Sequence, residues 1–125
     1  MKHILLAEDD PAILKMTKVR LQHAGYKVLA AVNGEEVLQI VDSNEGIHLI
    51  LIDIKMPKLD GLQVCQRLKT NPSTQKIPII VFTASSAQWQ KLTDQCLALG
   101  ISDWIKKPFD SRVLLDKVRR ALGEG

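Results

Sequence analysis

The chain is poor in cysteine and has no long apolar segment, and both shortages narrow the class of protein. Its two cysteines, Cys65 and Cys96, lie 31 positions apart, without the CxxC spacing of many zinc and redox sites. We therefore expect buried or half-buried free thiols in a reducing compartment. No apolar run approaches the roughly 20 residues that cross a bilayer, and the apolar stretch at the N-terminus is too short for a signal peptide. These absences favour a cytoplasmic protein with no membrane partner.

Aromatic residues are also scarce, at 4% of the chain, and the net charge is only +3. Residues 1–105 carry 11 basic and 11 acidic side chains, whereas residues 106–125 carry six basic and three acidic ones. A basic segment without interleaved aromatic residues is more typical of a solvated helix with cations near its C-terminus than of a nucleic-acid interface. We expect no direct nucleic-acid binding, and a basic face for an acidic partner is the alternative.

Short apolar runs alternate with segments of helical periodicity along the whole chain, and no internal repeat interrupts them. A length of 125 residues, 46% of them hydrophobic, predicts one domain over residues 1–125. The predicted strands are 4–7, 28–32, 49–52, 77–82 and 103–106, and the predicted helices are 11–25, 34–43, 59–70, 87–99 and 111–122. Continuous apolar strands alternating with helices predict an α/β fold with a parallel sheet covered on both faces. The best fit is a doubly wound, flavodoxin-like (βα)5 fold with strand order 2-1-3-4-5.

Acidic residues follow the first and third predicted strands at their carboxyl ends. Glu8 and Asp9 come directly after the first strand, and Asp53 ends the third. Asp10, followed by Pro11, has the separate role of a helix N-cap. Neighbouring strands would bring the other three carboxylates together, at the edge where such sheets bind ligands. Three carboxylates repel each other unless a cation joins them, and oxygen ligands suit Mg²⁺.

Two other strand ends add groups that bind phosphate. Thr83 ends the fourth strand with a hydroxyl, and Lys107 follows the fifth strand with an ammonium group. A carboxylate held beside Mg²⁺ can attack phosphorus and form an aspartyl phosphate. Each residue alone is ordinary, but their arrival at one edge of one sheet predicts a phosphoryl-transfer site with Asp53 as its acceptor.

The chain resembles bacterial response-regulator receiver domains over essentially its whole length. Four strings carry the resemblance in the correct order: residues 4–10 (ILLAEDD), 49–61 (LILIDIKMPKLDG), 79–84 (IIVFTA) and 100–109 (GISDWIKKPF). The resemblance implies a regulatory phospho-acceptor that is not an enzyme acting on outside substrates. It implies transfer of a phosphoryl group to Asp53 from a sensor histidine kinase or a phosphotransfer protein.

The resemblance also implies a role for each residue near the acceptor. Asp9 and Asp53 would bind Mg²⁺ directly, Glu8 would act largely through water, and the backbone carbonyl of Lys55 would be the third protein ligand. Glu8 stands where Asp is commoner in the family. The Lys55 ammonium group would tune the lifetime of the phosphate.

A second set of implied roles concerns the switch. Thr83 would hydrogen-bond the phosphoryl group and shift inward, Lys107 would pair with it, and the Lys107–Pro108 peptide bond would be cis. Trp104 occupies the aromatic switch position, usually Tyr or Phe. The face made by the fourth helix, fifth strand and fifth helix would change and could form a homodimer. His3, His23 and His48 are scattered and predict no metal site.

Two other classes of protein remain as alternatives. One is a binding module with the same fold that is never phosphorylated. The other is an enzyme on a doubly wound sheet, but the sequence has neither GxxxxGK[ST] nor GxGxxG. An aspartate-nucleophile phosphatase would want an acid two residues after Asp53, where Lys55 stands. A stand-alone regulator and a receiver cut from a longer chain fit equally well.

Overall fold

Ten elements alternate regularly between strand and helix in the computed structural model, which describes residues 1–43, 46–84 and 86–124. In chain order they are β1 (His3–Ala7), α1 (Pro11–His23), β2 (Lys27–Ala31), α2 (Gly34–Ser43), β3 (Leu49–Asp53), α3 (Gly61–Thr70), β4 (Ile79–Thr83), α4 (Ala87–Ala98), β5 (Asp103–Lys106) and α5 (Ser111–Ala121). All five predicted strand–helix units are therefore present in the predicted order.

The five strands form one parallel sheet in the order β2-β1-β3-β4-β5. This confirms the predicted doubly wound topology. Its switch point lies between β1 and β3, where Ala7 stands opposite Ile52. The residues that follow these two strands therefore leave the sheet side by side at its carboxyl edge.

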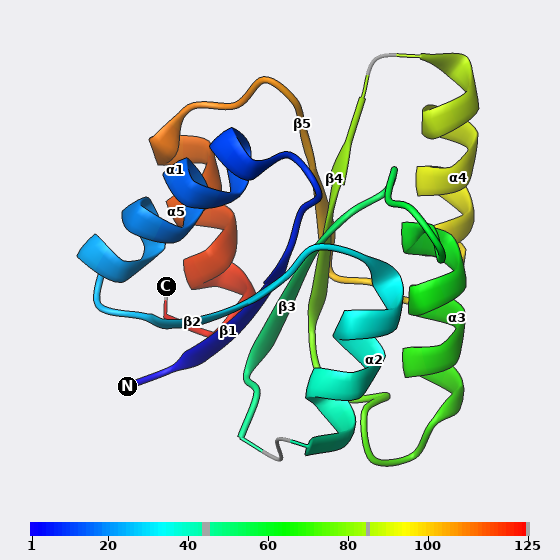
Figure 1. Ribbon diagram of the computed structural model, residues 1–125, viewed down its shortest axis with the longest axis horizontal. Helices are drawn as coiled ribbons and strands as arrows, with labels where there is room; N and C mark the ends of the chain where they lie inside the picture. Colours follow the sequence, from blue (N-terminus) through cyan, green and yellow to red (C-terminus); the bar gives the residue numbers. More distant parts are fainter. Residues whose placement is uncertain (44–45, 85, 125) are drawn as a thin grey trace.

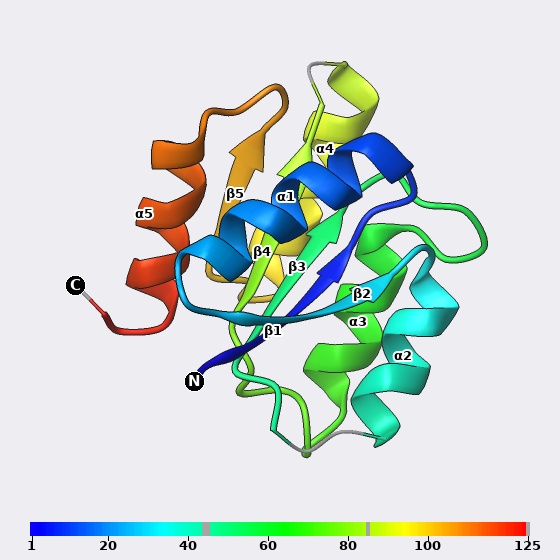
Figure 2. The same cartoon turned by 60° about the vertical axis from the view of Figure 1, so that its left-hand side comes forward.

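Helices cover both faces of the sheet, with α1 and α5 on one face and α2, α3 and α4 on the other (Figures 1 and 2). Successive strand residues point to opposite faces, so each strand contributes to two cores. In β4, Ile79 and Val81 belong to the core beneath α2, α3 and α4, whereas Ile80 and Phe82 belong to the core beneath α1 and α5. Burial on both faces explains why the strands read as continuous apolar runs.

The predicted element boundaries lie within two residues of the observed ones, and local capping accounts for the difference at the start of α3. The helix expected from residue 59 begins at Gly61, because the Asp60 side chain caps it by accepting from the Gln63 backbone N–H. Asp10 caps α1 as predicted, accepting from the backbone N–H groups of Ala12 and Ile13.

Cys65 and Cys96 are free and buried, as expected of them, and the reducing compartment stays a prediction. Over the described ranges, no helix combines the length and the apolar character needed to cross a membrane.

Candidate functional site

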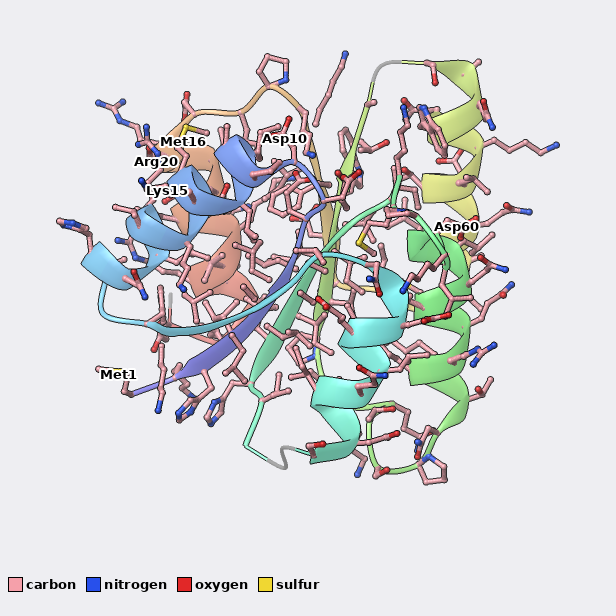
Figure 3. The ribbon with its side chains drawn as sticks, in the orientation of Figure 1. Met1, Asp10, Lys15, Met16, Arg20 and Asp60 are labelled. Carbon is pink, nitrogen blue, oxygen red and sulfur yellow. The ribbon has the colours of Figure 1, made fainter. Side chains whose placement is uncertain are left out.

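The three acids predicted to meet do so at the carboxyl edge of the sheet. One carboxylate oxygen from each of Glu8, Asp9 and Asp53 can be chosen such that all three lie within 4.8 Å of one another. Glu8 and Asp53 are buried, whereas Asp9 is exposed. Figure 3 shows the next acid, Asp10, at the start of α1, where it serves as the cap, and Asp60 at the start of α3. The cluster therefore has two buried oxygen ligands and one that solvent reaches, an arrangement that can hold a hard divalent cation.

Lys107 joins the two buried acids. Its Nζ donates to Glu8 Oε1 and, at 2.6 Å, to Asp53 Oδ2. The Lys107 backbone N–H donates to the Thr83 carbonyl at 2.9 Å, which extends the β4–β5 pairing by one residue. The Lys107–Pro108 peptide bond is cis, as predicted. The sequence predicted a lysine facing a phosphoryl group, and in the structure its ammonium group neutralises the two buried carboxylates.

These contacts shift the pKa values of Glu8 and Lys107. Burial, together with hydrogen bonding and repulsion from Asp53, raises the pKa of Glu8 to about 7, although Lys107 opposes the rise. Burial lowers the pKa of Lys107, but the hydrogen bonds and charges of Asp53 and Glu8 outweigh it and leave that pKa raised. Near neutral pH, the Glu8 carboxyl is therefore partly protonated, whereas Lys107 stays charged.

The loop after β3 orients the Asp53 carboxylate. The Lys55 backbone N–H donates to Asp53 Oδ1 at 3.1 Å, so one carboxylate oxygen is held by the loop and the other by Lys107. The Lys55 side chain is exposed, and its Nζ lies 5.8 Å from the centroid of the Trp89 ring in α4. The carbonyl of Lys55 as a metal ligand stays a prediction.

Gly61 lets α3 begin directly against this loop. An added Cβ there would lie 2.8 Å from Ile54 Cα and 3.0 Å from the Asp53 carbonyl oxygen. Both neighbours are backbone atoms at the end of β3 and in the loop after it, which cannot move without shifting Asp53. This close approach explains why glycine follows Asp60 at the end of the 49–61 string.

We expect Gly61→Ala to destabilise the fold by about 2 kcal/mol, since overpacking against backbone outweighs the ~1 kcal/mol that alanine gains over glycine in a helix. Urea unfolding would measure the change. Gly46→Ala is the matched control, because nothing lies within 4 Å of its added Cβ. Equal stabilities for the two variants would contradict this account of Gly61.

The two predicted switch residues have partners that the sequence did not indicate. Among the described residues, the hydroxyl of Thr83 has hydrogen bonds with the Thr93 hydroxyl at 2.8 Å and with the Ala84 carbonyl at 3.4 Å. Trp104 is half-buried, and Lys117 of α5 lies 5.1 Å from its ring centroid and donates to its carbonyl at 2.6 Å. Thr83 and Trp104 are therefore held by helices on opposite faces of the sheet.

The expectation that the histidines are scattered is wrong for two of them. The rings of His3 and His48 stack with centroids 5.8 Å apart, and His48 Nδ1 accepts from the His3 backbone N–H at 3.0 Å. The parallel pairing of β1 with β3 brings them together, which their separation in sequence conceals. In the described part of the chain, the one group of three or more possible metal-ligating acids, histidines or cysteines remains Glu8, Asp9 and Asp53.

Comparison with known families decides what kind of domain carries this site. Residues 4–119 match the family described as response regulator receiver domain. The chain belongs to this family. As a receiver domain, it is the phospho-acceptor module of two-component signalling, and the resemblance predicted from its four strings is confirmed.

Solved structures agree with this assignment. The receiver domain of a signal transduction histidine kinase from Syntrophus aciditrophicus is 32% identical, with a TM-score of 0.89, and the match covers 98% of this chain and 91% of that one. The receiver domain of a sensor histidine kinase from Pseudomonas aeruginosa is 28% identical, with a TM-score of 0.88 and 98% of each chain covered. That second structure has a magnesium ion coordinated in its active-site cleft.

Curated relatives are longer proteins. The DNA-binding dual master transcriptional regulator RpaA of Synechocystis is 37% identical over 122 residues, which are 98% of this chain and 49% of RpaA. The alkaline phosphatase synthesis regulatory protein PhoP of Bacillus subtilis is 35% identical, with 97% of this chain and 48% of PhoP covered. The receiver domain thus spans about half the length of the curated relatives it matches.

Proposed function

We propose that Asp53 is the phospho-acceptor of this receiver domain and that residues 1–125 form that single domain. The observation that carries the proposal is the convergence of Glu8, Asp9 and Lys107 on the Asp53 carboxylate. The donor would be the phosphohistidine of a sensor histidine kinase or of a phosphotransfer protein. An Asp53 oxygen forms the bond to phosphorus, the phosphorus–nitrogen bond breaks, and its electron pair leaves with the imidazole.

Mg²⁺ would be held by Asp9, Asp53 and the Lys55 carbonyl, with Glu8 acting through water. The chemistry of the donor set supports this, because it consists of carboxylate oxygens, which are hard ligands, and two of the three acids are buried side by side. When bound, the ion neutralises charge on the transferred group. Lys107 and the Thr83 hydroxyl would bind the phosphoryl oxygens.

The receiver domain would catalyse only its own phosphorylation and dephosphorylation. Its output would pass through a homodimer or partner contact on the α4–β5–α5 face. We propose no direct nucleic-acid contact, because two of the four basic residues of α5 pair with acids, Lys117 with Asp103 and Arg119 with Asp116. The buried free thiols suit the reducing cytoplasm.

Intact mass after incubation with Mg²⁺ and acetyl phosphate tests the assignment. We expect one phosphoryl adduct on the wild type, and none with a chelator or in Asp53→Asn. Asp10→Asn is the matched control that should keep the adduct, because Asn is an equally good N-cap. An adduct on Asp53→Asn would move the acceptor elsewhere, and no adduct on any protein would favour the binding module that is not phosphorylated.

A further inference from the structure

The hydroxyl of Thr83 is directed into the layer of α4. Alternation along β4 places Thr83 on the same face as Ile79 and Val81, both of which contribute to the core beneath α2, α3 and α4. In that layer it meets Thr93 of α4, and the two side chains are 1% and 0% exposed. A buried hydroxyl without a partner is unfavourable, so each of these threonines stabilises the other.

Thr93 connects Thr83 to the backbone of α4. Its Oγ1 lies 2.8 Å from Thr83 Oγ1 and 2.8 Å from the Trp89 carbonyl, one helical turn earlier. A hydroxyl has one hydrogen and two lone pairs, so Thr93 donates either to Thr83 or to the Trp89 carbonyl, and in the second case it accepts from Thr83. The remaining contact of Thr83, to the Ala84 carbonyl, is long at 3.4 Å. Thr93 is therefore its principal partner in the described structure.

A second active-site segment contacts the same turn of α4. Lys55, whose backbone N–H binds Asp53, places its ammonium group over the Trp89 ring, and Trp89 supplies the carbonyl that Thr93 contacts. The first turns of α4 thus contact both the loop after Asp53 and the end of β4. Exposed cation–π contacts are weak, whereas both threonines of the Thr83–Thr93 hydrogen bond are fully buried.

We propose that Thr93 is a positioning residue that holds the Thr83 hydroxyl on α4 in the unphosphorylated domain. The proposal rests on the proposed function, in which Thr83 binds the phosphoryl group. Thr83 must leave Thr93 to reach that group, so each phosphorylation breaks this hydrogen bond and frees α4 from the end of β4. The strength of the bond sets how strongly the unphosphorylated arrangement is favoured.

Removing the Thr93 hydroxyl should therefore favour the phosphorylated arrangement. A typical buried hydrogen bond changes a two-state equilibrium by about five-fold. We expect Thr93→Val, which keeps the shape of the side chain, to bind the phosphoryl mimic beryllofluoride about five-fold more tightly in saturating Mg²⁺. Thr93→Ala should show the same direction, and Thr93→Ser, which keeps the hydroxyl, should match the wild type.

Isothermal titration calorimetry with beryllofluoride measures these affinities, and a double-mutant cycle identifies their cause. In a Thr83→Ala background, Thr93→Val should give no further change, because the bond is already absent. Tighter binding that persists in this background would overturn the proposal. A merely structural role would lower the urea midpoint of Thr93→Val and leave its affinity at the wild-type value, which also overturns it.

Phosphorylation of the wild type distinguishes a failure of the role of Thr93 from a failure of Asp53 as the phospho-acceptor. If the wild type forms the phosphoryl adduct and Thr93→Val binds beryllofluoride no more tightly, Asp53 keeps its role and only the role of Thr93 fails. If the wild type forms no adduct, both fail together.

Discussion

Lys107→Met should destabilise the metal-free domain by roughly 2–3 kcal/mol at pH 8. The variant removes the cation that Glu8 and Asp53 share and leaves two buried carboxylates in contact. Breaking a buried ion pair in this way typically costs about 3–5 kcal/mol. The Lys107 side chain is 20% exposed, so solvent screening brings the expected loss to the bottom of this range or slightly below it.

The loss should shrink at pH 5 because Glu8 then carries a proton and can donate it to Asp53. The raised pKa of Lys107 means that its contribution persists up to its usual pKa and disappears only above the raised one. The difference between the stability losses of Lys107→Met at pH 5 and at pH 8 therefore reports on the protonation of Glu8, whose pKa is raised to about 7. Urea unfolding in chelator at both pH values measures it. The exposed neighbour Lys106 supplies the control Lys106→Met, and equal losses in the two variants would refute the shared ion pair.

Glu8→Gln should remove most of the pH dependence of Mg²⁺ binding. In the wild type, a proton on Glu8 competes with the cation below about pH 7, so we expect the affinity to fall about ten-fold from pH 8 to pH 6. A neutral amide cannot titrate and attracts the cation less. The variant should therefore bind Mg²⁺ about 10–100-fold more weakly at pH 8, with little further change at pH 6.

Calorimetric titration with MgCl₂ at pH 6, 7 and 8 checks this result. Glu35→Gln is the control, because Glu35 is an exposed acid paired with Lys58 and should leave the wild-type pH dependence intact. If Glu8→Gln still loses ten-fold in affinity between pH 8 and pH 6, another group is responsible for the competition.

The fold was predictable because its strongest signals are local. Apolar runs ended at acids, Gly25 ended a helical pattern, and the rule for parallel sheets then fixed the strand order. The convergence of Glu8, Asp9 and Asp53 followed from that order alone, since it depends only on which strands are neighbours. The predicted start of α3 was wrong because a cap determines it. The Asp60 side chain caps the helix, which therefore begins two residues later than the apolar pattern indicated.

Contacts between side chains on different elements were not predictable in the same way. In the sequence, Thr93 is an ordinary polar residue of a predicted helix. Its position in the helical pattern does not indicate that its hydroxyl forms a hydrogen bond with Thr83 between α4 and β4. The sequence placed Lys107 near a phosphoryl group but did not show that it joins Glu8 to Asp53 in the unphosphorylated state. The His3–His48 stack likewise depends on the register between β1 and the residue before β3.

The division of the interior into two cores has a consequence for how this domain can change over evolutionary time. Phe82 and Thr83 are adjacent in β4, yet Phe82 stacks on Phe109 on the side of α1 and α5 while Thr83 bonds α4 on the other side. The helices on the two faces pack against separate cores, and the effects of substitutions at sites far apart add. The packing of each layer can therefore change with little effect on the packing of the other, whereas a partner on the α4–β5–α5 face would contact helices of both layers.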